Sequence, residues 1–298
     1  MRQILAAHRL ELEEWRAAAI LLLPAMLGLL IFSFLPIAEA LQLSFYDASL
    51  ISEQREFIGT ENYTTALNDP VFRRAITNTI VYAIAVVVFQ VILALVLATM
   101  INHYFPGVGL FRSAYFLPVV TSLVVVSTVW KIMYHTDNGL INSLMRTLSL
   151  PPQEWLTSSS LALWSIVIIG VWKEVGFSML VLLGGLQSIS ADLYESASID
   201  GASGWTAFWR ITLPLLRRAL LFVVVYSTIN AFKIFIPIYV ITDGGPSNST
   251  QTMVFYIFQS AFRYFKLGYA SALSFLLLVM ILIMTAVQFR LLRSNVQY

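Results

Sequence analysis

The sequence predicts an all-α membrane protein with six transmembrane helices and a helical loop on the cytoplasmic side. Two observations predict this fold. Of the 298 residues, 58% are apolar and only 11% are charged, whereas a soluble domain usually carries about 25% charged residues. The apolar residues also gather in windows of about 20 residues, the length that crosses the hydrocarbon core of a bilayer. With so little polar surface, lipid must cover part of the chain.

Six windows are long and apolar enough to span a membrane. They are Ala17–Ala40, Asn78–Ile101, Phe111–Tyr134, Leu161–Leu186, Ala219–Ile241 and Tyr269–Gln288. Prolines inside them predict kinks, because proline removes a backbone hydrogen bond and collides with the preceding turn. These prolines are Pro24, Pro36, Pro118 and Pro237. Proline is common in membrane helices, so the kinks alone do not indicate a transport path.

The windows divide the chain into a cytoplasmic N-terminal segment (residues 1–16), a transmembrane domain (residues 17–291) and a cytoplasmic tail (residues 292–298). The N-terminal segment has mixed charges and lacks the short basic-then-apolar pattern of a cleaved signal peptide, so we expect it to be retained. Nine Arg residues lie in the segments that would face the cytoplasm, against six Lys or Arg outside. This bias favours both termini in the cytoplasm.

The composition excludes several functional classes. The chain has no cysteine, which excludes disulfides and thiolate metal sites, and its three histidines are too scattered to suggest a metal site. A net charge of +2 gives no case for a nucleic-acid partner. No phosphate loop of the form GxxxxGK[ST] occurs, so any ATP that drives transport must bind another chain. A membrane-embedded enzyme is disfavoured, since no histidine or paired-carboxylate cluster is present.

The loop of residues 187–217, between the fourth and fifth windows, is the most informative segment. Ser190 or Asp192 can cap a first short helix, and Gly201 permits a sharp turn. Gly204–Ile211 can form a second helix, which we expect Pro214 to end. A helical hairpin of this size is not stable alone in water, which indicates that it docks onto something.

Bulky aromatic side chains mark the second helix of this loop, at Trp205, Phe208 and Trp209. They suit docking onto a cytoplasmic protein. Tryptophan is equally favoured among lipid head groups, so an interfacial helix is an alternative. The residues alone leave both interpretations open.

The triplet Glu195-Ser196-Ala197, followed by Gly201 and by Ile211-Thr212-Leu213-Pro214, resembles the EAA loop of ABC importer permeases. In that pattern EAA precedes a glycine and an I-x-L-P ending. Ser196 stands where the family has alanine and is small enough for the same packing. Three other segments are similar to carbohydrate-type permeases, namely Phe57–Tyr63 (FIGTENY), Arg112–Pro118 (RSAYFLP) and Thr242–Pro246 (TDGGP).

The resemblance, which extends to maltose and glycerol-3-phosphate permease subunits, implies one half of a heterodimer in a bacterial-type inner membrane. The implied partners are a second homologous permease subunit, two ATP-binding subunits that hold ATP and Mg, an extracytoplasmic solute-binding protein, a carbohydrate substrate and membrane lipid. This chain itself would hold no cofactor and no metal, and would not be an enzyme. The resemblance assigns contact with the ATPase to Glu195, Ser196, Ala197, Asp200, Gly201, Arg210 and Pro214.

Ionisable residues inside a span are costly, so each is a functional candidate. Glu39 and Lys131 lie near window ends, where they can reach the interface. Lys173 and Glu174 lie in the fourth window and Lys233 in the fifth. We expect Glu174 and Lys233 to pair across the two helices. A pair that only fixes helix packing is the alternative.

Aromatic and amide side chains accompany these charges, as a sugar site requires apolar ring faces beside hydrogen-bonding groups. Together, the residues and the likeness to the maltose permease predict a substrate path of Trp172, Glu174, Phe177, Ser227, Asn230, Ala231, Lys233 and Ile234. Ala231 and Ile234 offer no side-chain hydrogen bonds, so the substrate contacts must differ from those of the maltose permease.

The expected function is therefore translocation of a sugar, glycoside or polyol by alternating access, driven by ATP on partner subunits. No Arg lies centrally in a span, which favours a neutral substrate. The alternative is a secondary transporter driven by an ion gradient, in which Glu174 and Lys233 would relay protons.

Overall fold

The computed structural model describes residues 15, 18–52, 54–102 and 107–292, and this part of the chain consists of helices and connecting loops with one small sheet. The predicted all-α class is confirmed. After a first helical stretch from Ala18, the elements are η1 (Leu30–Phe34), α2 (Leu35–Leu43), β1 (Tyr46–Ala48), β2 (Arg55–Phe57), α3 (Glu61–Asn68), α4 (Pro70–Ile101), α5 (Val108–Val120), α6 (Leu123–Met133), α7 (Leu140–Thr147), α8 (Ala162–Gln187), α9 (Ala191–Ile199), α10 (Gly204–Ala207), η2 (Phe208–Thr212), α11 (Leu213–Leu215), α12 (Arg217–Phe232), η3 (Ile238–Thr242), α13 (Met253–Phe258), η4 (Gln259–Arg263) and α14 (Leu267–Leu292). The four η elements are π-helices.

Four of the described helices are long and apolar enough to cross a membrane: Ala18–Leu43, α4, α8 and the Leu267–Leu291 stretch of α14. The bent pair α5 and α6 makes a fifth if it counts as one span. Most of the predicted N-terminal segment lies outside the described residues, which begin with Trp15 and continue from Ala18. Of the predicted tail, only Leu292 is described.

The second span is longer than its predicted window, because α4 begins at Pro70 and not at Asn78. The Asp69 carboxylate caps the helix by accepting a hydrogen bond from the Val71 N–H at 2.8 Å, and Pro70 occupies the first turn. Proline suits that position because its missing N–H would have no partner there. The extra turns carry Arg73 and Arg74, so the hydropathy window starts too late.

The third and fifth windows are not continuous helices. The third divides into α5 and α6, which meet at 97°. Pro118 lies inside α5, just before the break at Thr121 and Ser122. In the fifth window, α12 is only sixteen residues long and ends at Phe232, with Lys233 as its C-cap. The kink predicted at Pro118 is confirmed. Both windows go further and divide into separate helices, which hydropathy cannot detect because it does not register the backbone hydrogen bonds lost at a break.

The chain forms two compact units, each with its own packing. One comprises the described residues of Met1–Thr65 with Ser260–Phe275, and the other comprises those of Ala66–Gln259 with Leu276–Tyr298. In the first unit, β1 and β2 form an antiparallel hairpin in which Tyr46 lies opposite Phe57. The Asn62 amide donates to the Ser44 and Tyr46 carbonyl oxygens at 2.9 and 3.0 Å, so it ties the start of α3 to β1.

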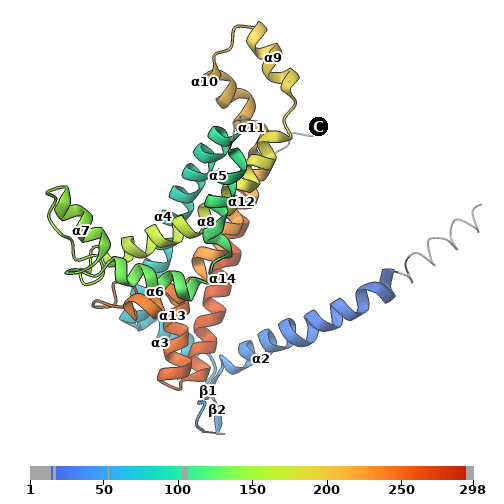
Figure 1. The fold of residues 1–298 in the computed structure, drawn as a ribbon. Coiled ribbons are helices and arrows are strands. Elements are labelled where there is room, and N and C mark those ends of the chain that lie inside the picture. The colour runs from blue at the N-terminus through green and yellow to red at the C-terminus, as the bar shows by residue number, and fades with distance from the viewer. Residues whose placement is uncertain (1–14, 16–17, 53, 103–106, 293–298) are drawn as a thin grey trace, which may run out of the picture. The chain divides into compact units, whose positions relative to one another are not determined.

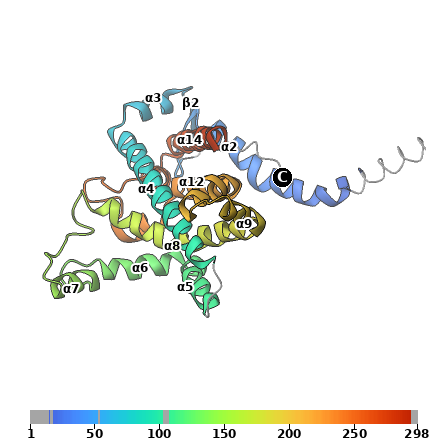
Figure 2. The same ribbon diagram turned by 90° about the horizontal axis from the view of Figure 1, so that it is seen from above.

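The second unit is built on α4, α8 and α12, which pack against one another (Figures 1 and 2). Between helices in a membrane, packing depends on close contact and hydrogen bonds, since lipid is as apolar as the side chains. Small residues permit that contact. A Cβ at Gly176 of α8 would lie 1.9 Å from the Tyr115 carbonyl oxygen of α5, so only glycine fits there.

Candidate functional site

A polar cavity of about 410 Å³ lies in the second unit, among α4, α8, α12 and the broken segment that follows α12. Tyr82 and Gln90 line it from α4, Glu174 from α8, and Tyr226 and Asn230 from α12. Carboxylate, amide and phenol groups thus converge beside aromatic rings. This mixture suits a small polyhydroxylated ligand, because such ligands need both apolar contact and directional hydrogen bonds.

Six of the eight residues predicted for the substrate path line this cavity, namely Glu174, Ser227, Asn230, Ala231, Lys233 and Ile234. Trp172 does not. It lines a separate apolar hollow of about 830 Å³ and meets Trp130 edge to face at 5.7 Å between ring centroids. Side chains two positions apart on an α-helix point about 200° apart around its axis. Trp172 and Glu174 therefore face nearly opposite ways.

Phe177 lies one layer behind the cavity wall. Its ring contacts Tyr226 with 4.6 Å between centroids, and Tyr226 itself lines the cavity. Phe177 therefore supports a lining residue.

Glu174 and Lys233 line the same cavity, but no ion pair joins them in the described part of the chain. Lys233 is exposed at the C-cap of α12, and Glu174 is half-buried. The expected pair is thus absent in this conformation, in which Lys233 lies at the C-cap where α12 ends. Both charges remain available to a ligand.

Lys173 has a different role from its neighbour. It is 7% exposed, and its Nζ donates a hydrogen bond of 2.7 Å to the Val119 carbonyl oxygen at the end of α5. Carbonyl groups in the last turn of a helix have no intrahelical partner. Lys173 therefore satisfies one of them at the point where the third span bends.

A second lysine acts at the other break. Lys131, in the last turn of α6, donates from Nζ to the Val240 carbonyl oxygen in η3 at 2.9 Å. The expectation that Lys131 lies near a helix end is confirmed. Its partner is a backbone carbonyl of the broken fifth span.

The sequence reasoning missed Gln90 and Tyr82, both on α4. Gln90 is 1% exposed, and its Nε2 lies 2.7 Å from Ser178 Oγ, 3.0 Å from Ser227 Oγ and 3.3 Å from the Glu174 carbonyl oxygen. One amide therefore joins α4 to α8 and α12. A signal was present, since Tyr82, Val86, Gln90, Ala94 and Ala98 recur every four residues along one face of the window.

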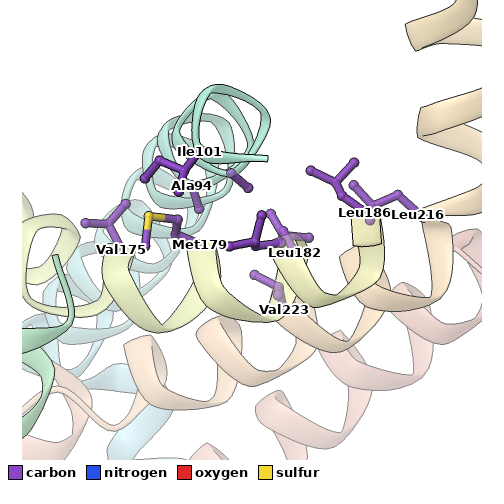
Figure 3. Packing of buried hydrophobic residues seen from close by; sticks show 10 residues of the cluster. Ala94, Ile101, Val175, Met179, Leu182, Leu186, Leu216 and Val223 are labelled. Atoms are coloured by element: carbon purple, nitrogen blue, oxygen red, sulfur yellow. The ribbon is translucent and has the colours of Figure 1, made fainter. Parts of the chain in front are cut away.

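On the other side of Gln90 the same three helices form a buried apolar cluster (Figure 3). Its members are Ala94, Ala98, Ile101, Val175, Met179, Leu182, Leu183, Leu186, Leu216 and Val223. Ala94 and Ala98 supply the small residues that let α4 approach α8 closely. The cluster reaches Leu186 and Leu216, which flank the loop of residues 187–217. Gln90 thus marks the boundary between polar cavity and apolar packing.

The loop of residues 187–217 forms two helices, as predicted, and these protrude beyond the ends of α8 and α12 (Figure 1). The Ser190 hydroxyl accepts from the Asp192 N–H, and the Ser203 hydroxyl accepts from the Thr206 N–H, so each helix has a serine N-cap. Gly201 lies between them at φ +77°, a left-handed conformation that favours glycine. The predicted turn at Gly201 is confirmed.

The second helix runs past Ile211 and ends next to Pro214, as predicted. The chain passes from α10 through η2 into α11, where Pro214 occupies the first turn. A π-helix moves each hydrogen bond one residue further along the chain. The helix stops at Leu215, and Leu216 forms a turn before α12 begins at Arg217. Tyr194 OH and Thr212 Oγ1 lie 2.9 Å apart and join the two arms of the loop.

Most of the residues expected to contact the ATPase are accessible: Glu195, Ser196, Asp200, Gly201, Arg210 and Pro214 are exposed, and Ala197 is half-buried. Large apolar side chains accompany them. Ile199 is 87% exposed, Trp205 73% and Trp209 51%. An exposed apolar group of this size indicates a binding surface for protein or lipid.

At the opposite end of α4, the TDGGP turn belongs to a buried polar loop. The Asn78 amide donates to the carbonyl oxygens of Asn248 and Gln251 at 2.9 and 2.8 Å. Thr79 Oγ1 accepts from the Met253 N–H at 2.9 Å. Gly244 adopts φ +83°, and a Cβ there would lie 2.3 Å from Gln251 Oε1. The turn is therefore fixed to the start of the second span.

No group of three or more His, Asp or Glu side chains that could hold a metal ion occurs among the residues that the structure describes.

The chain is similar in sequence to known permeases. It is 32% identical to the probable ABC transporter permease protein YurN of Bacillus subtilis, over 92% of this chain and 95% of that protein. It is 35% identical to the lactose transport system permease protein LacF of Rhizobium radiobacter, over 89% and 90%. It is 34% identical to the trehalose/maltose transport system permease protein MalF of Thermococcus litoralis, over 94% of each.

The fold has a solved counterpart. A chain in the crystal structure of a bacterial alginate ABC transporter, in complex with its alginate pentasaccharide-bound periplasmic protein, superposes with a TM-score of 0.81. The two chains are 24% identical, and the match covers 95% of this chain and 97% of the other.

The model of one protein family matches residues 110–295, which contain α8, α12, the loop between them and the lysines at both helix breaks. With the relatives above, this match confirms the resemblance seen in the motifs. The chain belongs to the family of binding-protein-dependent transport system inner membrane components.

Proposed function

We propose that this chain is the permease subunit of an ATP-driven importer that moves a sugar, glycoside or polyol across the membrane by alternating access. The protruding hairpin of α9 and α10 carries the proposal. Ile199, Trp205 and Trp209 are each more than half exposed there, although apolar groups of this size are usually buried. A groove on a partner subunit would cover them.

Two ATP-binding subunits would supply that groove. They would hold ATP and Mg, and this chain would hold no cofactor and carry out no covalent chemistry. The coupling contact would be made by Glu195, Ser196, Ala197, Asp200, Gly201, Arg210 and Pro214. Movement of the hairpin would pass to α8 and α12, because the hairpin is continuous with both helices through short connections at Ser188 and Leu216.

The cavity lined by Glu174, Ser227 and Asn230 would hold the substrate on its way across. Its volume of about 410 Å³ lies within the usual range of small-ligand sites, about 300–1,000 Å³. Two relatives are named for transport of lactose and of trehalose or maltose, which supports a sugar. Trp172 and Phe177 would act from behind this wall.

In this proposal the chain crosses the inner membrane six times, with the α5–α6 pair and the broken α12 segment each counted once. Both termini lie in the cytoplasm. A second homologous permease subunit completes the path as a heterodimer, and an extracytoplasmic solute-binding protein delivers the substrate. The buried loop held by Asn78 lies at the end of α4 away from the hairpin, where that protein would dock.

The energy source tests this function against the secondary-transporter alternative. The complete complex, reconstituted in proteoliposomes with its binding protein, is expected to take up radiolabelled lactose, maltose or trehalose only when the ATPase side holds ATP. Collapse of the proton gradient with an uncoupler should leave uptake within about twofold. Uptake that follows the proton gradient and ignores ATP would contradict the proposal and favour a proton relay through Glu174 and Lys233.

A further inference from the structure

Gln90 combines deep burial with a position on the cavity wall. Its side chain is 1% exposed and lies where α4, α8 and α12 meet. The Nε2 group has three acceptors within hydrogen-bonding distance, which are the hydroxyls of Ser178 and Ser227 and the carbonyl oxygen of Glu174. An amide buried at membrane depth is costly unless its polar atoms are paired.

The Glu174 carbonyl decides which way the amide faces. A backbone carbonyl oxygen can only accept, so the –NH₂ group of Gln90 must point toward it. The Oε1 atom therefore points elsewhere. Gln90 Oε1 accepts no hydrogen bond from any described residue. It is also not among the fully buried polar atoms that lack a partner, so part of its surface is accessible. The remaining surface of the side chain is the cavity.

We propose that Gln90 is a specificity-determining residue of the permease, in which the –NH₂ group fixes the three helices and Oε1 accepts a hydrogen bond from a substrate hydroxyl. This inference rests on the proposed function of the cavity as the sugar path. The acceptor lies at the last polar position before the apolar cluster of Ala94 and Met179. A ligand without a hydroxyl at that point would leave the carbonyl oxygen unpaired, which disfavours its binding.

Uptake kinetics of the complete importer test the proposal, with whichever of lactose, maltose and trehalose it transports as the probe. Gln90→Met is expected to raise KM at least tenfold, which corresponds to about 1.4 kcal/mol, and to reduce assembly as well, because it also removes the –NH₂ contacts to three helices. Gln90→Glu, which burial keeps protonated, retains a carbonyl oxygen toward the cavity, and its hydroxyl can donate to the Glu174 carbonyl oxygen. Its KM should stay within about threefold of the parent.

A matched control is Gln288→Met. Gln288 also joins two helices, through a 2.6 Å hydrogen bond from Nε2 to Thr228 Oγ1, but it does not line the polar cavity. Its KM should not change. A purely structural role for Gln90 predicts a different pattern, in which Met and Glu variants lose assembly or maximal rate together and KM stays constant. That pattern would overturn the proposal.

Thiol accessibility tests the orientation without any substrate. The chain has no cysteine, so Gln90→Cys places a single thiol at the site. In the assembled complex it should react with a water-soluble methanethiosulfonate reagent, detected by mass spectrometry of this chain. An unreactive thiol, with and without ATP, would overturn the proposal. A reactive thiol together with no ATP-dependent uptake of any of the three sugars would instead contradict the proposed function.

Discussion

At the scale of single residues, Lys131 and Lys173 serve backbone carbonyl groups, while Glu174 and Lys233, together with Lys173, line the polar cavity. Lys173 and Lys131 each donate to a carbonyl oxygen beside a helix break, at Val119 and Val240. A lysine near a helix C-terminus also interacts favourably with the helix dipole. Glu174 and Lys233 line the cavity and make no ion pair with each other in the described part of the chain. Sequence position alone does not separate these roles.

Replacement of the buried lysine tests its structural role. Lys173→Met leaves the Val119 carbonyl oxygen without its partner at a site that water scarcely reaches, which should destabilise the protein by about 1–3 kcal/mol. Thermal unfolding of the purified complex in detergent would measure this. Lys131→Met is the matched control, because Lys131 makes the same kind of bond but is exposed. Its loss should be clearly smaller. Equal effects of the two variants would refute a special role for Lys173.

At the scale of elements, the hairpin of α9 and α10 depends on one backbone conformation. Gly201 has φ +77° and Gly204 does not have positive φ, yet a Cβ at either position would meet no atom within 4 Å. The two glycines therefore differ in backbone strain and not in available space. Left-handed backbone costs a residue with a Cβ about 1–2 kcal/mol.

Gly201→Ala should thus weaken the hairpin, and the ATP-binding subunits should co-purify with the variant in reduced amount. Gly204→Ala should leave co-purification unchanged, since it begins α10 in ordinary helical conformation. Membrane insertion should be normal for both, as judged by the amount of permease in washed membranes. If both variants bound the ATPase as the parent does, the hairpin would not be the coupling contact.

At the scale of the whole molecule, α4 connects the TDGGP loop to the apolar cluster beside the hairpin. Asn78 holds the TDGGP loop, and Ile101 packs in the cluster that contains Leu186 and Leu216 beside the hairpin. These two residues of α4 are about 35 Å apart along the helix, at 1.5 Å per residue. The hydrocarbon core of a bilayer is about 30 Å thick. The distance between these two residues is therefore enough to cross the bilayer, as the proposed function requires of a protein that receives substrate on one side and contacts an ATPase on the other.

Single cysteines can test this orientation, because the chain has none of its own. Leu291 lies on the same side as the hairpin, since Arg217 donates to its carbonyl oxygen at 2.9 Å. Ile199→Cys and Leu291→Cys should react with a membrane-impermeant maleimide only from the cytoplasm, and Ser247→Cys only from outside. Labelling of Leu291→Cys and Ile199→Cys from different sides would contradict the arrangement.

The sequence by itself determined that this protein is a polytopic helical membrane protein, and its motifs placed it among importer permeases. Apolar composition and window length follow from the thickness of the bilayer, so they can be read without a structure. Local backbone signals were readable as well: Gly201 forms the predicted turn, and Ser190 caps α9. These features depend on neighbouring residues only.

Only the tertiary structure decided which polar residues meet. Gln90 contacts Ser178 and Ser227, residues far from it along the chain. Lys173 turns away from Glu174 to a carbonyl of α5, and Trp172 faces an apolar hollow instead of the cavity. Each outcome depends on the rotation of one helix against another and on where α5 and α12 break. Hydropathy averages over a whole helix, so it carries no information on either.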